Sequence, residues 1–383
     1  MKINIFGSTG IIGSKTINLI NKNFPQYKIN LLTANTNVKK LLKQIKICKP
    51  KYVYLNDQTK INLLKKNINK TIILSKKELS DYLNSSKSDF TILAISGYNS
   101  LNFLQEILNN TKNLGLVSKE SIVSAGHLFK KNKFFKKTNI YPIDSEHFAL
   151  SNKINISTNI NSIKNIYLTA SGGPFLGINH QNLKNISFKK AINHPKWKMG
   201  YKNSIDSATL VNKCLEVIEA HYLFDLPFEK INILIHPQSI VHAIVENYNY
   251  VSEMILFNNN MDIPILNFLN YNNKKRIFIK NKNLFYKNFS KFDFQNVDIK
   301  QFPIYQFFNK LEKTPINLIK FNIANEYAVE LFKEKRIKYT DIYKIIIKLT
   351  SLDLYSPLNT IKDIINYHEL FKEYIYQKYS NIN

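Results

Sequence analysis

Two carboxylates stand close together in residues 142–147, where one serine separates Asp144 from Glu146. If this segment is extended, the two side chains point to the same side of the backbone. Carboxylate oxygens are the hard ligands that Mg²⁺ and Mn²⁺ prefer. The pair therefore indicates a metal site, and the alternative for so short a motif is an acidic surface turn.

The chain near residues 206–222 has the pattern of a helix and carries a second group of polar residues. A helix places Asn212, Lys213 and Glu216 on one face. Glu216 adds a third carboxylate for a metal ion, whereas an ammonium and an amide group are typical phosphate ligands. This segment therefore indicates a site for a metal ion and a phosphate group.

Residues 7–13 read Gly-Ser-Thr-Gly-Ile-Ile-Gly, after a strand pattern and before a helical one. Glycines let a backbone approach a pyrophosphate, and a helix N-terminus favours anions, so we expect a dinucleotide loop rather than an ordinary tight turn. Residues 31–37 contain no Asp or Glu to bind a ribose hydroxyl, which favours NADP over NAD. Lys39 and Lys40 follow, either as ligands of a 2′-phosphate or as a solvent-facing helix surface.

Three further positions extend this interpretation. Lys119 follows a strand pattern and would bring an ammonium group near a nicotinamide, and Ser171 lies in a glycine-containing turn that exposes N–H groups to an anion. Trp197, the only tryptophan, either closes over a ligand or packs onto its own domain. Together these features indicate a metal-assisted, nicotinamide-dependent enzyme acting on a small phosphorylated substrate.

Alternating strand and helix patterns in residues 1–150 predict a Rossmann-like, doubly wound parallel sheet. We expect strands at 3–6, 29–33, 52–55, 72–74, 91–95 and 115–117, and helices at 12–22, 37–47 and 99–110. Residues 151–285 predict an α+β domain with strands at 163–170, 231–235 and 241–246. Residues 286–300 look like a linker, and helical periodicity at 316–334, 339–348 and 358–376 predicts a helical bundle over 301–383.

Composition narrows the function classes. The chain has 383 residues, 44% of them hydrophobic, and lacks an apolar run of the about 18 residues that span a membrane. A strand pattern at the first residues leaves no room for a signal or transit peptide, and two cysteines imply no disulfide framework, so we expect a cytoplasmic protein. The net charge of +27 comes from dispersed lysines, which favours compositional bias over a nucleic-acid site.

Eight stretches, in matching order, resemble the 1-deoxy-D-xylulose 5-phosphate reductoisomerase family. They are residues 7–13, 119–121, 142–147, 168–175, 194–200, 204–219, 235–242 and 322–326. The resemblance implies an NADPH domain, a central catalytic and dimerising domain with a mobile flap over residues 171–201, and a C-terminal helical bundle. It therefore implies a homodimer that binds a small phosphorylated sugar. The dispersed charge and the lack of a long apolar run predict that nucleic acids and membranes are not partners.

The resemblance also implies roles for individual residues. The metal ligands are Asp144, Glu146 and Glu216, which are also the catalytic residues together with Lys119. The substrate ligands are Ser145, Glu146, Ser171, His194, Ser207, Asn212, Lys213 and Glu216, with Trp197 and Met199 on the flap. The cofactor ligands are Thr9, Gly10, Ile11, Ile12, Ala34, Asn35, Thr36, Asn37, Ser118, Lys119, Glu120 and Gly200.

The reaction that the resemblance implies converts 1-deoxy-D-xylulose 5-phosphate to 2-C-methyl-D-erythritol 4-phosphate in the non-mevalonate isoprenoid pathway. It uses NADPH and Mn²⁺ or Mg²⁺, with Co²⁺ as a further option, and rearranges the carbon skeleton before hydride transfer. Ile11, Thr36 and Ser118 depart from the family pattern, which usually has a serine, a basic residue and an asparagine there.

Two other functions are open from the residues alone. A different nicotinamide-dependent oxidoreductase, such as an aldehyde or homoserine dehydrogenase, would not need the carboxylates of Asp144, Glu146 and Glu216. A basic RNA- or DNA-binding protein would show an affinity that falls steeply with salt.

Overall fold

The computed structural model describes residues 1–129, 137–154, 158–197, 199–271 and 291–379. Contacts divide the chain into two compact units. The first contains Met1–Ser121, Phe129–Phe148 and a segment that begins at Asn260, and the second contains Ile122–Leu128, Ala149–Asn259 and the C-terminal part of the chain. The division into domains over 1–150, 151–285 and 301–383 stays a prediction, and most of the stretch 272–300 lies outside the described residues.

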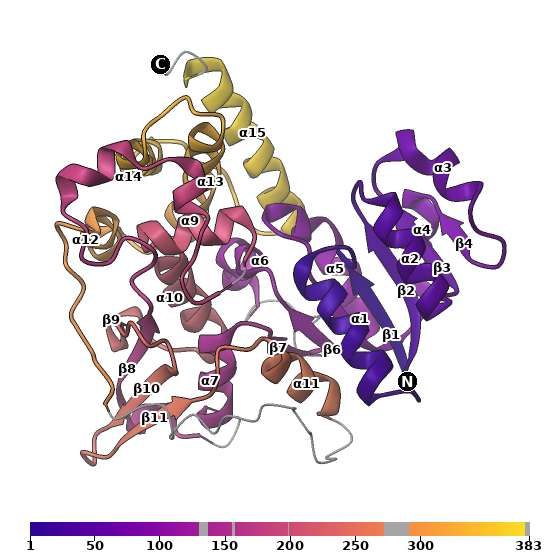
Figure 1. The fold of residues 1–383 in the computed structure, drawn as a ribbon, viewed down its shortest axis with the longest axis horizontal. Helices are drawn as coiled ribbons and strands as arrows, with labels where there is room; N and C mark the ends of the chain where they lie inside the picture. Colours follow the sequence, from indigo (N-terminus) through magenta and orange to yellow (C-terminus); the bar gives the residue numbers. More distant parts are fainter. Residues whose placement is uncertain (130–136, 155–157, 198, 272–290, 380–383) are drawn as a thin grey trace. The chain divides into compact units, whose positions relative to one another are not determined.

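The first unit contains a seven-stranded parallel sheet in the order β4-β3-β2-β1-β5-β6-β7 (Figure 1). Its strands are β1 (Lys2–Phe6), β2 (Lys28–Ala34), β3 (Tyr52–Leu55), β4 (Ile72–Leu74), β5 (Ser88–Leu93), β6 (Thr111–Leu116) and β7 (Asn139–Pro142). The strand order reverses between β1 and β5, and such a switch point is where doubly wound sheets bind ligands. The predicted sheet is confirmed, although β5 and β6 begin earlier than expected and β7 was not predicted.

Helices of the first unit connect the strands. They are α1 (Ile11–Asn23), α2 (Val38–Cys48), α3 (Ile61–Lys65), α4 (Lys76–Ser85) and α5 (Leu101–Asn110), followed much later in the chain by α11 (Asp262–Asn270). Phe268 of α11 packs edge-on against Phe90 of β5, with 5.3 Å between ring centroids. The hydroxyl of Tyr27 donates a hydrogen bond to the carbonyl of Leu269 at 2.8 Å. These contacts place α11 in the apolar core of the first unit.

The second unit contains a four-stranded sheet in the order β11-β10-β8-β9. Its strands are β8 (Ile163–Ala170), β9 (Ile231–Ile235), β10 (Val241–Asn247) and β11 (Ser252–Leu256). β8 and β9 are parallel, whereas β10 is antiparallel to both of its neighbours. This mixed sheet confirms the predicted α+β pattern, and only β11 was not expected.

The remaining helices include those of the predicted C-terminal bundle. α6 (Lys119–Ala125) and α7 (Ser145–Lys153) begin in the first unit and end in the second. The others are α8 (Phe188–Ala191), α9 (Tyr201–Thr209), α10 (Val211–Phe224), α12 (Pro303–Lys310), α13 (Pro315–Lys333), α14 (Ile342–Thr350) and α15 (Ile361–Tyr379). Helix α13 is buried along most of its length, and its buried residues include the polar side chains of Lys320, Asn322 and Asn325.

Two local expectations are wrong. Residues 142–147 are not extended, because α7 begins at Ser145, and Asp144 accepts the backbone N–H of Glu146 at 3.1 Å as a capping residue does. The expected helix near 206–222 is two helices, which are separated by Leu210 in the left-handed region with φ of 68°. Leucine is a good helix former, so its residue type gives no signal for this break.

Candidate active site

The loop of residues 7–13 connects β1 to α1 and depends on two of its glycines. Gly7 has φ of 73°, and a Cβ atom there would lie 2.4 Å from the carbonyl oxygen of Ala94. A Cβ atom on Gly13 would lie 2.4 Å from the carbonyl oxygen of Gly7. Glycine is therefore required for the loop to fold onto the start of α1, whose N–H groups and dipole favour a phosphate.

Gln44 of α2 holds this loop from behind and was not found by sequence reasoning. Its amide group donates to the carbonyl of Ser8 at 2.7 Å and accepts the hydroxyl of Ser8 at 2.8 Å. Gln44 is buried beside Leu41 and Ile45 on the apolar face of α2. A polar residue within an apolar helix stripe is the only signal that could have revealed it.

The predicted cofactor residues after β2 lie where the strand ends. Ala34 is the last residue of β2, and Asn35, Thr36 and Asn37 are exposed. Asn37 accepts the backbone N–H of Lys40 at 3.0 Å and so caps α2. Residues 35–37 themselves carry amide and hydroxyl side chains without a carboxylate, which favours NADP over NAD, although Asp57 after β3 donates its backbone N–H to the carbonyl of Asn35 at 3.0 Å.

Three further predicted cofactor residues lie at the start of α6, where Ser118 precedes the helix and Lys119 and Glu120 are its first residues. The hydroxyl of Ser118 donates to Glu120 at 2.9 Å and receives a bond from Ser100 at 3.1 Å. Lys119 is buried, and its ammonium group lies 3.2 Å from Asp144. Serine at position 118 is therefore part of a buried hydroxyl and carboxylate network.

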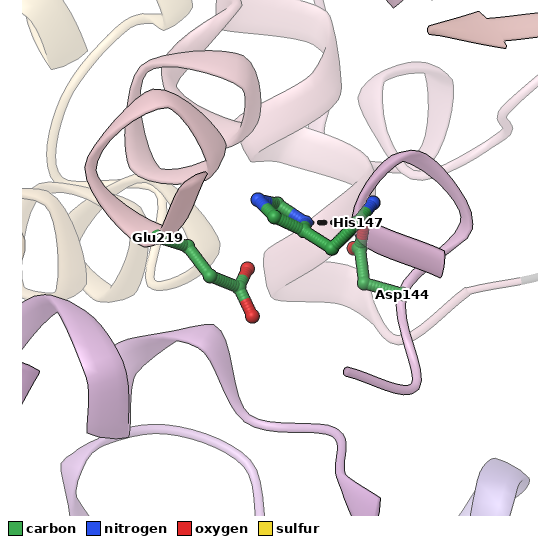
Figure 2. A group of neighbouring side chains, drawn as sticks. All are labelled: Asp144, His147 and Glu219. Carbon is green, nitrogen blue, oxygen red and sulfur yellow. Dashed lines mark hydrogen bonds and ion pairs between the residues drawn. The ribbon is translucent and has the colours of Figure 1, made fainter. Parts of the chain in front are cut away.

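Asp144 is held by several donors within the first unit. Its Oδ1 atom accepts the backbone N–H of Glu146 and the ring Nδ1–H of His147, the latter at 2.9 Å (Figure 2). Its Oδ2 atom faces Lys119, and Ser145 donates to Glu146 at 2.5 Å. His147 is fully buried, and sequence reasoning assigned it no role.

Helix α10 carries the third predicted metal ligand in the second unit. The amide of Asn212 donates to one oxygen of Glu216, and the ammonium group of Lys213 lies 2.5 Å from the other. Both Lys213 and Glu216 are buried. The predicted common face of α10 is confirmed. Glu219, one turn further along α10, is also buried and is drawn in Figure 2.

The residue types of the predicted metal ligands, two in the first unit and one in the second, suit a divalent cation. Asp144, Glu146 and Glu216 offer carboxylate oxygens, and the side chains of Asp144 and Glu216 are only 14% and 2% exposed. Buried carboxylates require a nearby positive charge, which Lys119 and Lys213 supply in the structure. Mg²⁺ and Mn²⁺ are the metals that such all-oxygen ligands suit.

The structure brings together Ser171, His194 and Ser207, which we call the serine–histidine cluster. The Nε2 atom of His194 lies 3.1 Å from the hydroxyl oxygen of each serine. Its Nδ1 atom accepts the backbone N–H groups of Lys196 at 3.1 Å and Trp197 at 3.0 Å. In a neutral ring the proton must therefore sit on Nε2, which faces the two serines.

The charge of His194 follows from its surroundings. Burial, and after it the nearby charge of Lys196, lowers the pKa of His194 from 6.5 to about 4. The ring is therefore neutral at pH 7. One N–H and two hydroxyl groups converge at the cluster, and this arrangement is able to bind an anion without a charge of its own.

The predicted flap residues Trp197 and Met199 follow His194 in the chain and precede α9. The indole ring of Trp197 lies 6.4 Å from the imidazole ring of His242, edge to face. Met199 is half-buried, and Gly200 is the N-cap residue of α9. The contact with His242 agrees with either prediction for Trp197, and Lys198 lies outside the described residues.

Three family models match consecutive parts of the chain. The model for 1-deoxy-D-xylulose 5-phosphate reductoisomerase matches residues 3–126. Two models for C-terminal domains of the same enzyme match residues 140–224 and 256–374.

Curated relatives extend the similarity over nearly the whole chain. The 1-deoxy-D-xylulose 5-phosphate reductoisomerase of Pelagibacter ubique is 37% identical over 94% of each chain. The chain belongs to the 1-deoxy-D-xylulose 5-phosphate reductoisomerase family. The reductoisomerase of Sulfurihydrogenibium is 38% identical over 95% of this chain and 94% of its own.

Solved structures of the family have the same fold. A crystal structure of DOX-P reductoisomerase with NADPH, fosmidomycin and magnesium superposes with a TM-score of 0.89 at 31% identity, covering 99% of this chain and 98% of the other. The reductoisomerase of Zymomonas mobilis, in complex with NADPH, gives a TM-score of 0.85 at 31% identity, covering 97% of each chain.

Proposed function

We propose that this chain is the reductoisomerase that converts 1-deoxy-D-xylulose 5-phosphate to 2-C-methyl-D-erythritol 4-phosphate, with NADPH and a divalent metal ion, in the non-mevalonate isoprenoid pathway. The observation that carries the proposal is similarity to this family over 94% of the chain, in a fold that matches a family structure with a TM-score of 0.89. That family structure contains NADPH and magnesium.

The metal ligands in this proposal are Asp144, Glu146 and Glu216, with Mg²⁺ or Mn²⁺ as the ion and Co²⁺ as a further option. A bound divalent cation would supply Lewis-acid polarisation of the substrate oxygens. His147 and Lys119 support the role of Asp144, because their bonds fix its carboxylate. Lys119 also places an ammonium group where α6 begins.

The phosphate group of the substrate binds to the serine–histidine cluster and to Asn212 and Lys213. The cluster supports this role because its donors converge and its histidine is neutral, while Lys213 provides the positive charge. Ser145 binds a substrate hydroxyl, and residues 171–201 act as a flap with Trp197 and Met199 over the bound substrate. Closure of such a flap excludes water from a reactive carbonyl intermediate.

NADPH binds along the loop of residues 7–13 and the end of β2. Thr9, Gly10, Ile11 and Ile12 supply loop backbone for the pyrophosphate. Residues 34–37 line the ribose, and Ser118, Lys119, Glu120 and Gly200 lie near the nicotinamide. The exposed residues 35–37, none of which carries a carboxylate, support NADPH over NADH.

We also propose a cytoplasmic homodimer. Among the described residues, no helix has both the length and the apolar character that a membrane crossing needs. Strand β11 lies at an edge of the four-stranded sheet. Met254 of β11 exposes 48% of its surface, and Tyr250 and Val251, just before the strand, expose 90% and 51%. An exposed apolar sheet edge supports association with a second copy, which sedimentation measurements test.

The experiment that tests the activity follows NADPH absorbance after addition of 1-deoxy-D-xylulose 5-phosphate. The assay is run with Mg²⁺, with Mn²⁺ and with EDTA, and is repeated with NADH. We expect oxidation of NADPH that requires metal and substrate. Turnover that survives EDTA would favour a metal-independent oxidoreductase, and a folded protein that binds NADPH without turnover would refute the proposed reaction.

A further inference from the structure

Tyr339, from the C-terminal part of the chain, caps the break between α9 and α10. In a continuous helix the carbonyl of Ala208 would accept the N–H of the residue four positions later. The helix breaks at Leu210, and the hydroxyl of Tyr339 donates to this carbonyl at 2.6 Å instead. Tyr339 is 7% exposed, and burial raises its pKa, so the hydroxyl keeps its proton.

The same tyrosine contacts the turn that carries Ser171. Its ring lies edge-on to Phe175, with 5.2 Å between centroids. The turn itself packs directly on α9, because a Cβ atom on Gly173 would lie 2.9 Å from the Cα of Ala208. Tyr339 therefore lies against both segments that supply the serines of the serine–histidine cluster.

Asn325 of α13 provides a second support. Its amide donates to Asp206 at 3.0 Å, and Lys202 pairs with the other oxygen of Asp206 at 2.7 Å. Asn325 is fully buried and Asp206 is 1% exposed. Asp206 precedes Ser207 in the chain, so this buried network fixes the last turn of α9 just before the break.

We propose that Tyr339 and Asn325 are positioning residues that hold Ser171 and Ser207 at bonding distance from His194, so that the C-terminal helices set the affinity for the substrate phosphate. The inference rests on the proposed function only in naming that phosphate as the ligand. Neither residue lies in the serine–histidine cluster itself, and both act through backbone or side-chain contacts to the segments that carry it.

The experiment compares two tyrosine variants that each lose one buried hydroxyl. Tyr339→Phe removes the donor to Ala208, whereas Tyr367→Phe removes a donor to the carbonyl of Leu354, at 3.0 Å within the C-terminal part. Calorimetric titration gives the Kd of each variant for 1-deoxy-D-xylulose 5-phosphate and for NADPH. We expect Tyr339→Phe to raise the substrate Kd and KM about tenfold with NADPH binding unchanged, and Tyr367→Phe to change neither.

A second pair removes buried amides from one helix. Asn325→Leu deletes the donor to Asp206, whereas Asn322→Leu deletes a donor to Glu326 within α13. We expect only Asn325→Leu to weaken substrate binding when the two variants have similar melting temperatures. Substrate Kd values that are unchanged in Tyr339→Phe and Asn325→Leu, or that rise equally in the control variants, would overturn the inference.

Failure of the proposed function is distinguishable from failure of this inference. If the wild-type chain does not bind 1-deoxy-D-xylulose 5-phosphate, the proposed substrate is wrong. Inorganic phosphate then serves as the probe, because it tests the proposed phosphate site without the rest of the substrate. A phosphate Kd that is raised in Tyr339→Phe and not in Tyr367→Phe would still support the inference.

Discussion

The loop of residues 7–13 and the serine–histidine cluster are both candidate anion sites, and they are built in different ways. The loop is one continuous segment whose shape comes from backbone and from glycines without side chains. The cluster takes Ser171, His194 and Ser207 from separate segments. Its distances depend on how these segments pack, not on their local conformation.

The residues that support the two sites also differ in how far they lie from them in the sequence. Gln44 holds the loop from α2, the next helix in the chain. The cluster is held by Tyr339 and Asn325, which come from a part of the chain more distant in sequence. A motif search therefore detects the loop, whereas the fold is needed to recognise the cluster and its supports.

The largest effect is expected when a predicted metal ligand is changed, because turnover should fall while NADPH binding is retained. Glu216→Gln removes one carboxylate charge beside Lys213 and should lower metal-dependent kcat/KM by about a hundredfold or more. NADPH binding at the loop should remain, which a fluorescence titration checks. Glu229→Gln, at an exposed position, is the control for the change in charge. Full turnover in Glu216→Gln would show that Glu216 is not a required metal ligand.

The second expected effect tests the loop through its backbone. Gly13→Ala places a Cβ atom 2.4 Å from the carbonyl oxygen of Gly7, so the loop must shift, and the NADPH Kd should rise by at least about tenfold. Gly10→Ala is the graded control, because its Cβ atom would lie 3.2 Å from the same oxygen. Equal NADPH affinities in both variants would contradict the role of close packing.

A smaller effect is expected when the support of the loop is removed. Gln44→Leu keeps the apolar contacts of α2 but loses both bonds to Ser8, and the NADPH Kd should rise by about five- to tenfold. The substrate Kd, measured by calorimetry, should not change. Asn30→Leu, which removes a buried amide bonded to Tyr82, serves as the matched control. The comparison between the sites would fail if Gln44→Leu weakened substrate binding instead.

The smallest expected effect is a pH dependence of the free energy of unfolding that comes from His194 of the serine–histidine cluster. The folded pKa of His194 is about 4, below its ordinary value of 6.5, so the unfolded chain binds this proton at higher pH. The free energy of unfolding should therefore fall as the pH drops from 6.5 toward 4. His194 is partly exposed, so we expect about 1 kcal/mol after allowing for solvent screening.

Urea unfolding of the wild-type protein and of His194→Gln, at about pH 7 and about pH 5, measures the contribution of His194 to the free energy of unfolding. The glutamine does not titrate, and the difference between the two proteins isolates His194 from other buried histidines such as His368. If the free energies of unfolding of the two proteins differ by the same amount at both pH values, the pKa of His194 is not lowered by folding.

Much of the fold was predictable because it follows from short-range patterns. The apolar runs of β1 and β2 and the glycines at positions 7 and 13 specify strand, turn and helix within a few residues. The common face of Asn212, Lys213 and Glu216 likewise follows from helix periodicity. These parts needed no information from distant segments.

Other parts were not predictable from local sequence. The short strand β7 and the early start of α7 were missed, because few residues carry their pattern. Leu210 breaks a helix although its residue type favours one, and the carbonyl of Ala208 at this break accepts the hydroxyl of the distant residue Tyr339. Gln44 and His147 have roles that depend on what they touch.

The sequence by itself therefore determined the family, the parallel sheet, the dinucleotide loop and the residue types available for metal and phosphate. Only the tertiary structure decided which donors surround Asp144, where α9 ends and which side chains hold the serine–histidine cluster. The physical reason is that backbone preference acts over neighbouring residues, whereas a hydrogen bond such as Tyr339 to Ala208 exists only after distant segments have packed.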